Sequence, residues 1–270
     1  IEPSFDAGAG AAGRWSRAEL DALRSAQPGR RLLAYLSIGE AEDYRDYWIR
    51  AWDARRDGQP DPGAPRWLLS ANPQWKGNYR VRYWSADWQA LVLTELDRCL
   101  EAGFDGLYLD LVDAFETFEY DPARRDWVEN RLNPDTGRMY RQDMAEWVRH
   151  IAAHARSRRP DAWIVAQNGE ALLADEAYRA ALNAAALEDL WSDGRRLHKP
   201  EEVEHRLACL RPWRNGGGIV FAIEYAVRAD LRAAVLHAAR RDGLPLLLTD
   251  RELSTLGEWH SAAGARSRER

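Results

Sequence analysis

The sequence predicts an α/β protein built as a single (β/α)8 TIM barrel. Its 270 residues are close to the size of one such barrel and near the upper limit for a single hydrophobic core. Hydrophobic residues make up 46% of the chain and charged residues 30%, so a large core can form. Apolar runs of strand length alternate with stretches of helical periodicity throughout, which is the pattern of repeated βα units.

Local signals predict each element in turn. A capping box of Ser16 and Glu19 opens the first helix, which stops near Pro28. Ser85 and Gly103 are placed as the caps of the next helix. Helices are expected at about residues 16–28, 88–102, 142–158, 176–182, 200–210 and 230–241. Strands are expected at residues 32–38, 79–83, 106–111, 163–167, 185–188, 218–224 and 246–249, with residues 1–5 as the remainder of an eighth.

These units form one uninterrupted series. We therefore expect one domain over residues 1–260, followed by a polar tail at residues 261–270. The chain begins at Ile1 rather than Met, so a leader peptide is expected to have been removed, which is consistent with an extracytoplasmic location. Cys99 and Cys209 lie far apart in predicted helices, which argues against a disulfide framework. We expect a monomer.

Composition and missing motifs exclude several function classes. No apolar run approaches the roughly 18 residues of a membrane span. The net charge is −5 with no basic block, which argues against nucleic acid as a partner. The sequence contains no GxSxG, HExxH, CxxC or Walker motif, so triad, zincin and phosphate-loop chemistries have no support. No cofactor and no metal ion are implied.

Two weaker signals compete with this interpretation. Residues 8–13 match GxGxxG, but the capping box starts the helix only at Ser16, so a flexible loop is favoured over dinucleotide binding. Glu146, His150 and His154 share one helical stripe that resembles a metal site. Because this helix should lie on the outer ring of the barrel, a solvated stripe is favoured.

Polar residues follow nearly every predicted strand. Chemistry in a TIM barrel is carried at the carboxyl ends of its strands, so these residues are expected at one mouth. A convergence of several carboxylates exceeds what the ending of strands requires, and it favours a functional site. The residues are Glu40, Asp110, Asp113, Gln167, Asn168, Glu188, Glu224 and Asp250.

Asp110 and Glu188 are the most informative of these. Period-two alternation places Asp110 on one face with Tyr108, whose hydroxyl is expected to stabilise the Asp110 anion. Glu188 shares its face with alanines, which favours its neutral, proton-donating form. Two carboxylates on different strands are what glycoside hydrolysis requires, one as nucleophile or base and one as proton donor.

Several motifs resemble glycoside hydrolase family 114. They are LLAYLSIGEAEDYRDYW (32–48), NPQWKGNYRVRYW (72–84), AGFDGLYLDLVDAFE (102–116), AQNGE (166–170), ALEDLW (186–191) and LLLTDREL (246–253), which together cover nearly the whole chain. Members of this family are described as endo-α-1,4-polygalactosaminidases. The resemblance implies a catalytic Asp at the end of strand four and a catalytic Glu at the end of strand six, which match Asp110 and Glu188.

We therefore expect an endo-acting, retaining glycoside hydrolase that cleaves α-1,4-linked, galactosamine-rich polysaccharide. By analogy with other barrel α-glycosidases, Asp110 would be the nucleophile and Glu188 the acid/base. The remaining alternatives are a non-catalytic carbohydrate-binding barrel and a metal-dependent polysaccharide deacetylase. The residues expected to contact substrate are Tyr35, Glu40, Trp75, Lys76, Tyr108, Asp113, Gln167, Asn168, Glu224, Tyr225 and Asp250.

Overall fold

The computed structural model describes residues 1–4 and 13–262. Within them the chain forms two compact units, each of which is described by itself. Unit 1 contains residues 1–169 and 180–182, whereas unit 2 contains residues 170–179 and continues from residue 183. The predicted glycine loop at 8–13 and the predicted tail at 261–270 lie largely outside the described residues. In the part of the chain that is described, no helix is both long enough and apolar enough to cross a membrane.

Unit 1 is built on three parallel strands in the order β1, β5, β8. They are β1 (Leu33–Ser37), β5 (Gly106–Asp110) and β8 (Trp163–Gln167). At the free edge of β1, the Ile1 nitrogen donates to Leu33 O (2.8 Å) and Tyr35 N donates to Ile1 O (2.8 Å). The first residue therefore pairs with this edge, although it is not part of an assigned strand.

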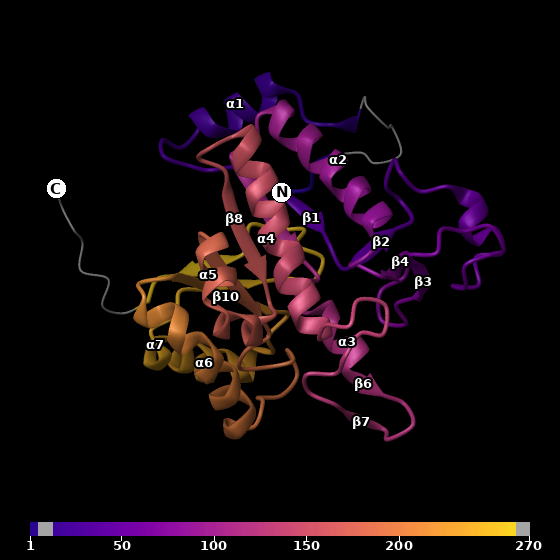
Figure 1. The fold of residues 1–270 in the computed structure, drawn as a ribbon. Helices are drawn as coiled ribbons and strands as arrows, with labels where there is room; N and C mark the ends of the chain where they lie inside the picture. Colours follow the sequence, from indigo (N-terminus) through magenta and orange to yellow (C-terminus); the bar gives the residue numbers. More distant parts are fainter. Residues whose placement is uncertain (5–12, 263–270) are drawn as a thin grey trace. The chain divides into compact units, whose positions relative to one another are not determined.

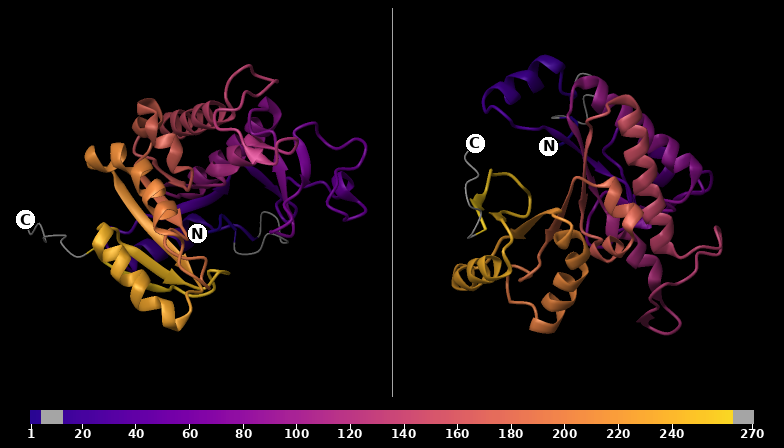
Figure 2. Two further views of the ribbon diagram at one scale, coloured as in Figure 1. Left: turned by 90° about the horizontal axis from the view of Figure 1, so that it is seen from below. Right: turned by 60° about the vertical axis from the view of Figure 1, so that its left-hand side comes forward.

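The helices of unit 1 follow the predicted caps. They are α1 (Arg17–Ser25), α2 (Ala86–Ala102), the short α3 (Phe115–Glu119), α4 (Tyr140–Arg158) and the 3-10 turns η2 (Arg50–Asp53) and η3 (Val112–Ala114). The Ser16–Glu19 capping box opens α1, and Gly103 closes α2 with a left-handed φ of 115°. Figure 1 shows α2 and α4 side by side, and the views in Figure 2 agree.

A small antiparallel sheet corrects one prediction. Its strands are β2 (Glu40–Glu42), β3 (Leu68–Ala71) and β4 (Asn78–Val81), in the order β2, β4, β3. The strand predicted at 79–83 is therefore not a barrel strand. Its apolar alternation reflects packing on an aromatic cluster, in which the Tyr79 ring lies 4.6 Å from that of Trp48. A second insertion after α3 forms a hairpin of β6 (Tyr120–Asp121) and β7 (Asp126–Trp127).

Unit 2 continues the βα pattern. Its parallel strands are β9 (Ala184–Glu188), β10 (Ile219–Tyr225) and β11 (Leu246–Thr249), and β12 (Glu258–His260) pairs antiparallel with β11. The helices and turns are η4 (Glu170–Ala174), α5 (Glu176–Ala181), α6 (Pro200–Asn215) and α7 (Ala229–Asp242). Pro200 occupies the predicted first turn of α6, but this helix runs beyond Leu210. Figure 2 shows α6 and α7, in orange and yellow, in the same part of the chain as these strands.

The close approach of β5 to β8 gives a stability test. A Cβ added at Gly106 would lie 2.1 Å from Trp163 O, which is backbone and cannot move aside. Gly106→Ala is expected to lower the free energy of unfolding, measured with urea, by about 3 kcal/mol or more. Gly29→Ala is the matched control, because Gly29 has φ of 80° but no atom within 4 Å of the added Cβ. Its cost should be about 1 kcal/mol. Equal losses in both variants would refute the steric explanation.

Candidate active site

Asp110 ends β5 and is fixed by two donors. In the parallel register, Tyr35 pairs with Tyr108 and Ser37 with Asp110, so these side chains lie on one face. The Tyr35 hydroxyl donates to Asp110 Oδ2 (2.7 Å), and Leu111 N donates to Oδ1 (2.8 Å). Both donors stabilise the ionised carboxylate. Burial and the charge of Asp110 raise the pKa of Tyr35 well above its usual value, so this hydroxyl keeps its proton.

Tyr108 connects the ends of β5 and β8. Its hydroxyl donates to Gln167 Oε1 at the end of β8. Gln167 is buried, and its Nε2 has no hydrogen-bond partner among the described residues. The next residue, Asn168, has a left-handed φ of 57° and is half-buried. The ends of β5 and β8 thus present Asp110, Tyr108 and Gln167 together.

The predicted residues near β2 divide into buried and exposed groups. Glu40 is buried and accepts from Asn72 Nδ2 (2.9 Å) and Asn78 Nδ2 (3.3 Å). Burial raises its pKa. Its oxygens therefore brace the small antiparallel sheet. Trp75, which is 50% exposed, and the exposed Lys76 lie in the turn between β3 and β4.

Asp113 comes from another segment of unit 1. It lies in the 3-10 turn η3, three residues after Asp110, and is half-buried. The turn starts directly after Leu111, which has a left-handed φ of 59°. Asp113 therefore follows the end of β5 closely in the chain.

Glu188 ends β9 in unit 2. The register pairs Glu188 with Ile223, and Tyr225 with Thr249, so Glu188, Tyr225 and Thr249 share one face of the sheet. The Tyr225 hydroxyl donates to Glu188 Oε1. Each of the two predicted catalytic carboxylates thus accepts a tyrosine hydroxyl from an adjacent strand.

Glu224 lies on the opposite face of β10 from Tyr225. Its side chain is fully buried, and it accepts from Trp191 N (2.7 Å) and Ser192 Oγ (2.6 Å). Burial raises its pKa to about 7, against the opposing effect of these hydrogen bonds. Both oxygens of Glu224 bind the loop after β9, whereas its contact with substrate stays a prediction.

Asp250 follows β11 and organises a turn. Its oxygens accept from Ser254 N (2.8 Å), Thr255 N (3.1 Å) and the Thr255 hydroxyl (2.8 Å). These hydrogen bonds, that from the Ser254 backbone foremost, lower the pKa of Asp250 to about 2. It is therefore an ionised turn-capping group.

Sequence reasoning missed Glu170 and Arg206. Glu170 begins η4, and its carboxylate pairs with the Arg206 guanidinium from α6. Arg206 Nη1 also donates to Glu188 O (3.0 Å) and Asp189 O (3.1 Å). The AQNGE motif (166–170) contained the signal for Glu170, since this residue follows the β8 strand by three positions. Nothing in the sequence identifies Arg206 among the many arginines.

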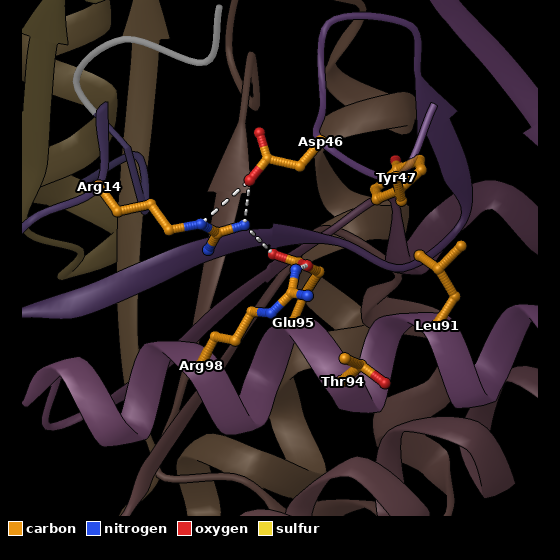
Figure 3. A pocket seen from close by; sticks show the side chains of 7 residues that line it. All are labelled: Arg14, Asp46, Tyr47, Leu91, Thr94, Glu95 and Arg98. Carbon is orange, nitrogen blue, oxygen red and sulfur yellow. Dashed lines mark hydrogen bonds and ion pairs between the residues drawn. The ribbon is translucent and has the colours of Figure 1, made fainter. Parts of the chain in front are cut away.

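A cavity elsewhere in unit 1 is lined by charged side chains that form ion pairs with one another. It measures about 510 Å³ and is shown in Figure 3. Arg14 Nη2 donates to Asp46 (2.9 Å) and Glu95 (2.6 Å), and Arg98 also binds Glu95. The charges of this cavity therefore neutralise one another and tie the segment before α1 to α2.

The helical stripe of Glu146, His150 and His154 contacts neighbouring side chains. Glu146 pairs with Arg149 (2.7 Å), and His154 Nε2 pairs with Asp97 (2.8 Å). The His150 ring stands edge-on to that of Trp147. Among residues 1–4 and 13–262 no group of three or more His, Cys, Asp or Glu side chains is arranged to hold a metal ion.

Comparison with known families resolves the identity of the chain. The model of glycoside hydrolase family GH114 matches residues 11–265. The chain belongs to glycoside hydrolase family GH114. Two uncharacterized proteins are similar to this GH114 chain: one of Deinococcus radiodurans, at 37% identity over 90% of the chain and 70% of that protein, and one of Methanocaldococcus jannaschii, at 34% over 79% and 56%. The GH114 chain thus spans little more than half of the second relative.

Solved structures show the fold of this GH114 chain. The glycoside hydrolase domain of PelA from Pseudomonas aeruginosa matches with a TM-score of 0.65 and 20% identity, over 92% of the chain and 88% of that domain. Aspergillus fumigatus Ega3, in complex with galactosamine, matches with a TM-score of 0.62 and 18% identity, over 91% and 84%. These neighbours are TIM-barrel glycoside hydrolases, and the predicted TIM-barrel fold is confirmed.

The buried Glu224 predicts a pH dependence of stability. Its pKa rises from 4.5 to about 7 on folding, so its contribution is fully present below about pH 4.5 and is lost as the pH rises through 7. Glu224→Gln cannot titrate. The free energy of unfolding of the wild type relative to this variant should therefore fall by about 2–3 kcal/mol between pH 4.5 and pH 8. Urea denaturation measures this difference in the free energy of unfolding. A difference that stays constant with pH would contradict the raised pKa of Glu224.

Proposed function

We propose that this GH114 protein is an endo-acting, retaining glycoside hydrolase that cleaves α-1,4-linked, galactosamine-rich polysaccharide. The observation that carries the proposal is a shared hydrogen bond at two strand ends. Asp110 and Glu188 each accept a hydrogen bond from a tyrosine hydroxyl on a neighbouring strand. Family membership supports the hydrolase, and the galactosamine bound by the similar Ega3 supports the sugar. An extracytoplasmic location and a monomeric state belong to the same proposal.

Asp110 is the nucleophile in this mechanism. Its carboxylate attacks the anomeric carbon while the glycosidic C–O bond breaks, giving a covalent glycosyl ester. The Tyr35 hydroxyl and Leu111 N hold the Asp110 oxygens in place, so the anion is oriented before substrate arrives. The same two donors stabilise the Asp110 carboxylate that forms again when the ester is hydrolysed.

Glu188 moves the proton. In the first step its carboxyl group gives a proton to the departing glycosidic oxygen, and in the second step the resulting carboxylate takes a proton from the attacking water. The water oxygen becomes the new anomeric hydroxyl, and Asp110 leaves as a carboxylate. Tyr225 orients Glu188 for both transfers.

Side chains in both units suit an amino sugar polymer. The exposed ring of Trp75 offers a flat face for a sugar ring, and Gln167 Nε2 and Thr249 Oγ1 are buried polar atoms with no partner among the described residues. Tyr108, Asp113, Asn168 and Lys76 complete the proposed contacts. Carboxylates near the bound sugar favour a protonated amine over a neutral N-acetyl group.

The first test is Asp110→Asn. The amide cannot act as the nucleophile, so release of reducing ends from partly deacetylated α-1,4-galactosamine polymer should fall by about 10⁴-fold or more with the fold retained. Circular dichroism checks the fold. Turnover within tenfold of the wild type would remove Asp110 from the mechanism.

A second test assigns the proton donor. Glu188→Gln should reduce kcat by about 10²–10⁴-fold on the polymer but much less on an aryl α-galactosaminide with a good leaving group. Glu170→Gln is the matched variant, because this glutamate lies in the same unit and is paired with Arg206. It should not show the dependence on leaving group. If Glu170→Gln shows it and Glu188→Gln does not, Glu170 is the proton donor.

A third test addresses the substrate and the two rival functions. Partly deacetylated polymer should be cleaved faster than fully acetylated polymer, and the preference should weaken as salt rises. The reverse order would contradict recognition of the amine. Cleavage that survives a chelator supports the hydrolase, chelator-sensitive release of acetate supports a deacetylase, and binding without turnover supports a carbohydrate-binding barrel.

A further inference from the structure

The segment that follows Glu188 is held in place by several hydrogen bonds and an ion pair. We call residues 189–192 the β9 elbow. Asp189 has a left-handed φ of 46°, a conformation that is strained for a non-glycine residue. Asp189 N donates to Ile223 O (2.9 Å), and its carboxylate pairs with Arg251 (2.8 Å). The elbow therefore depends on contacts with its surroundings to keep this shape.

Glu224 supplies the innermost of these contacts. Both of its oxygens are used, one by Trp191 N and the other by the Ser192 hydroxyl, and the side chain is fully buried. A buried carboxylate is costly to keep unless it is hydrogen-bonded, so these two bonds are strong constraints on the elbow. The charged group that acts on Glu224 from the elbow is Asp189. Trp191 extends the connection to α7, because its indole N–H donates to Asp242 (2.9 Å).

Arg206 holds the same segment by its carbonyl oxygens. Its guanidinium binds the carbonyls of Glu188 and Asp189, whereas Glu224 binds the N–H and O–H donors two and three residues later. On the other face of β10, the next residue after Glu224 is Tyr225, which donates to the Glu188 carboxylate. Strand β10 thus contacts Glu188 directly through Tyr225, and it acts on Glu188 indirectly because Glu224 holds the β9 elbow.

We propose that Glu224 is a positioning residue for Glu188: by holding the β9 elbow it sets the place and orientation of the Glu188 carboxyl group, without touching substrate. This inference rests on the role proposed above for Glu188. It assigns a function to a buried carboxylate whose oxygens both face the elbow. A purely structural role would stabilise the fold without any effect specific to proton donation.

The experiment uses the full chain and three single variants. Glu224→Ala removes both contacts, Glu224→Gln keeps an oxygen that can accept from Trp191 N, and Asp143→Asn is the control. Asp143 is a buried carboxylate on α4 in unit 1 that accepts from Asn133 and Thr136 (2.7 Å each). Both kcat and KM are measured on α-1,4-galactosamine polymer and on an activated aryl α-galactosaminide.

Glu224→Ala should lower kcat on the polymer by about 10–100-fold with KM changed by less than about threefold, since a small displacement of a catalytic group costs this much. The loss should be much smaller on the activated glycoside, as for Glu188→Gln, and Glu224→Gln should restore part of it. In a Glu188→Gln background, Glu224→Ala should cost less than about twofold, because the two residues act through one group. Asp143→Asn should leave both rates within about twofold below its melting temperature.

Equal losses on both substrates, or losses that multiply fully in the double variant, would overturn the inference. If Glu224→Ala does not fold, Ser192→Ala removes one of the two contacts and should show the same pattern at smaller size. A wild type that is inactive, or a Glu188→Gln variant without dependence on the leaving group, would instead refute the proposed function. In that event a crystal structure of Glu224→Ala, or of Ser192→Ala if the alanine variant at 224 does not fold, still decides: an unmoved elbow and an unmoved Glu188 side chain overturn the positioning role.

Discussion

Parallel strand register is the constraint on which the candidate site depends. In unit 1 the pairing of Ser37 with Asp110 places Tyr35 one pleat below the carboxylate and on the same face, within hydrogen-bond reach. In unit 2 the pairing of Ile223 with Glu188 places Tyr225 one pleat beyond Glu188, on the same face and within hydrogen-bond reach. A slip of one residue in either pair would turn the carboxylate to the opposite face and separate it from its tyrosine. Packing of the strands therefore determines the chemistry at their ends.

The carboxylates of this chain have two kinds of surroundings. Asp110 and Glu188 are half-buried and end their strands, whereas Glu40 and Glu224 are buried and accept hydrogen bonds from neighbouring segments. The cost of burying a charge makes such a group a strong constraint once its donors are in place. This explains why the strand ends carry more carboxylates than a pair of catalytic groups requires.

The sequence was most informative where a feature is local. Apolar runs located β1, β5, β8, β9, β10 and β11, and cap signals located α1 and α2, because backbone and side-chain preferences act over a few residues. Alternation also assigns the faces of β10: Glu224 shares a face with Val220 and Ala222, and Tyr225 shares the other with Ile223.

Features that depend on distant pairing were not predictable from one sequence. The alternation at 79–83 fits a barrel strand equally well, because a short buried strand of an antiparallel sheet has the same pattern, and only its pairing with β2 and β3 shows otherwise. The Tyr35–Asp110 bond joins residues 75 positions apart, so one sequence does not reveal it. Arg206 could not be distinguished from other arginines until α6 was placed beside η4.

The most direct test of this account is a crystal structure of the Asp110→Asn variant with a bound α-1,4-galactosamine oligosaccharide. The account predicts that the scissile glycosidic oxygen lies within about 2.6–3.2 Å of the Glu188 carboxyl group, with the anomeric carbon facing residue 110. It further predicts an amine on that sugar rather than an acetamide. An oligosaccharide whose glycosidic oxygen meets Glu170, or one bound away from residue 110, would contradict the catalytic pair.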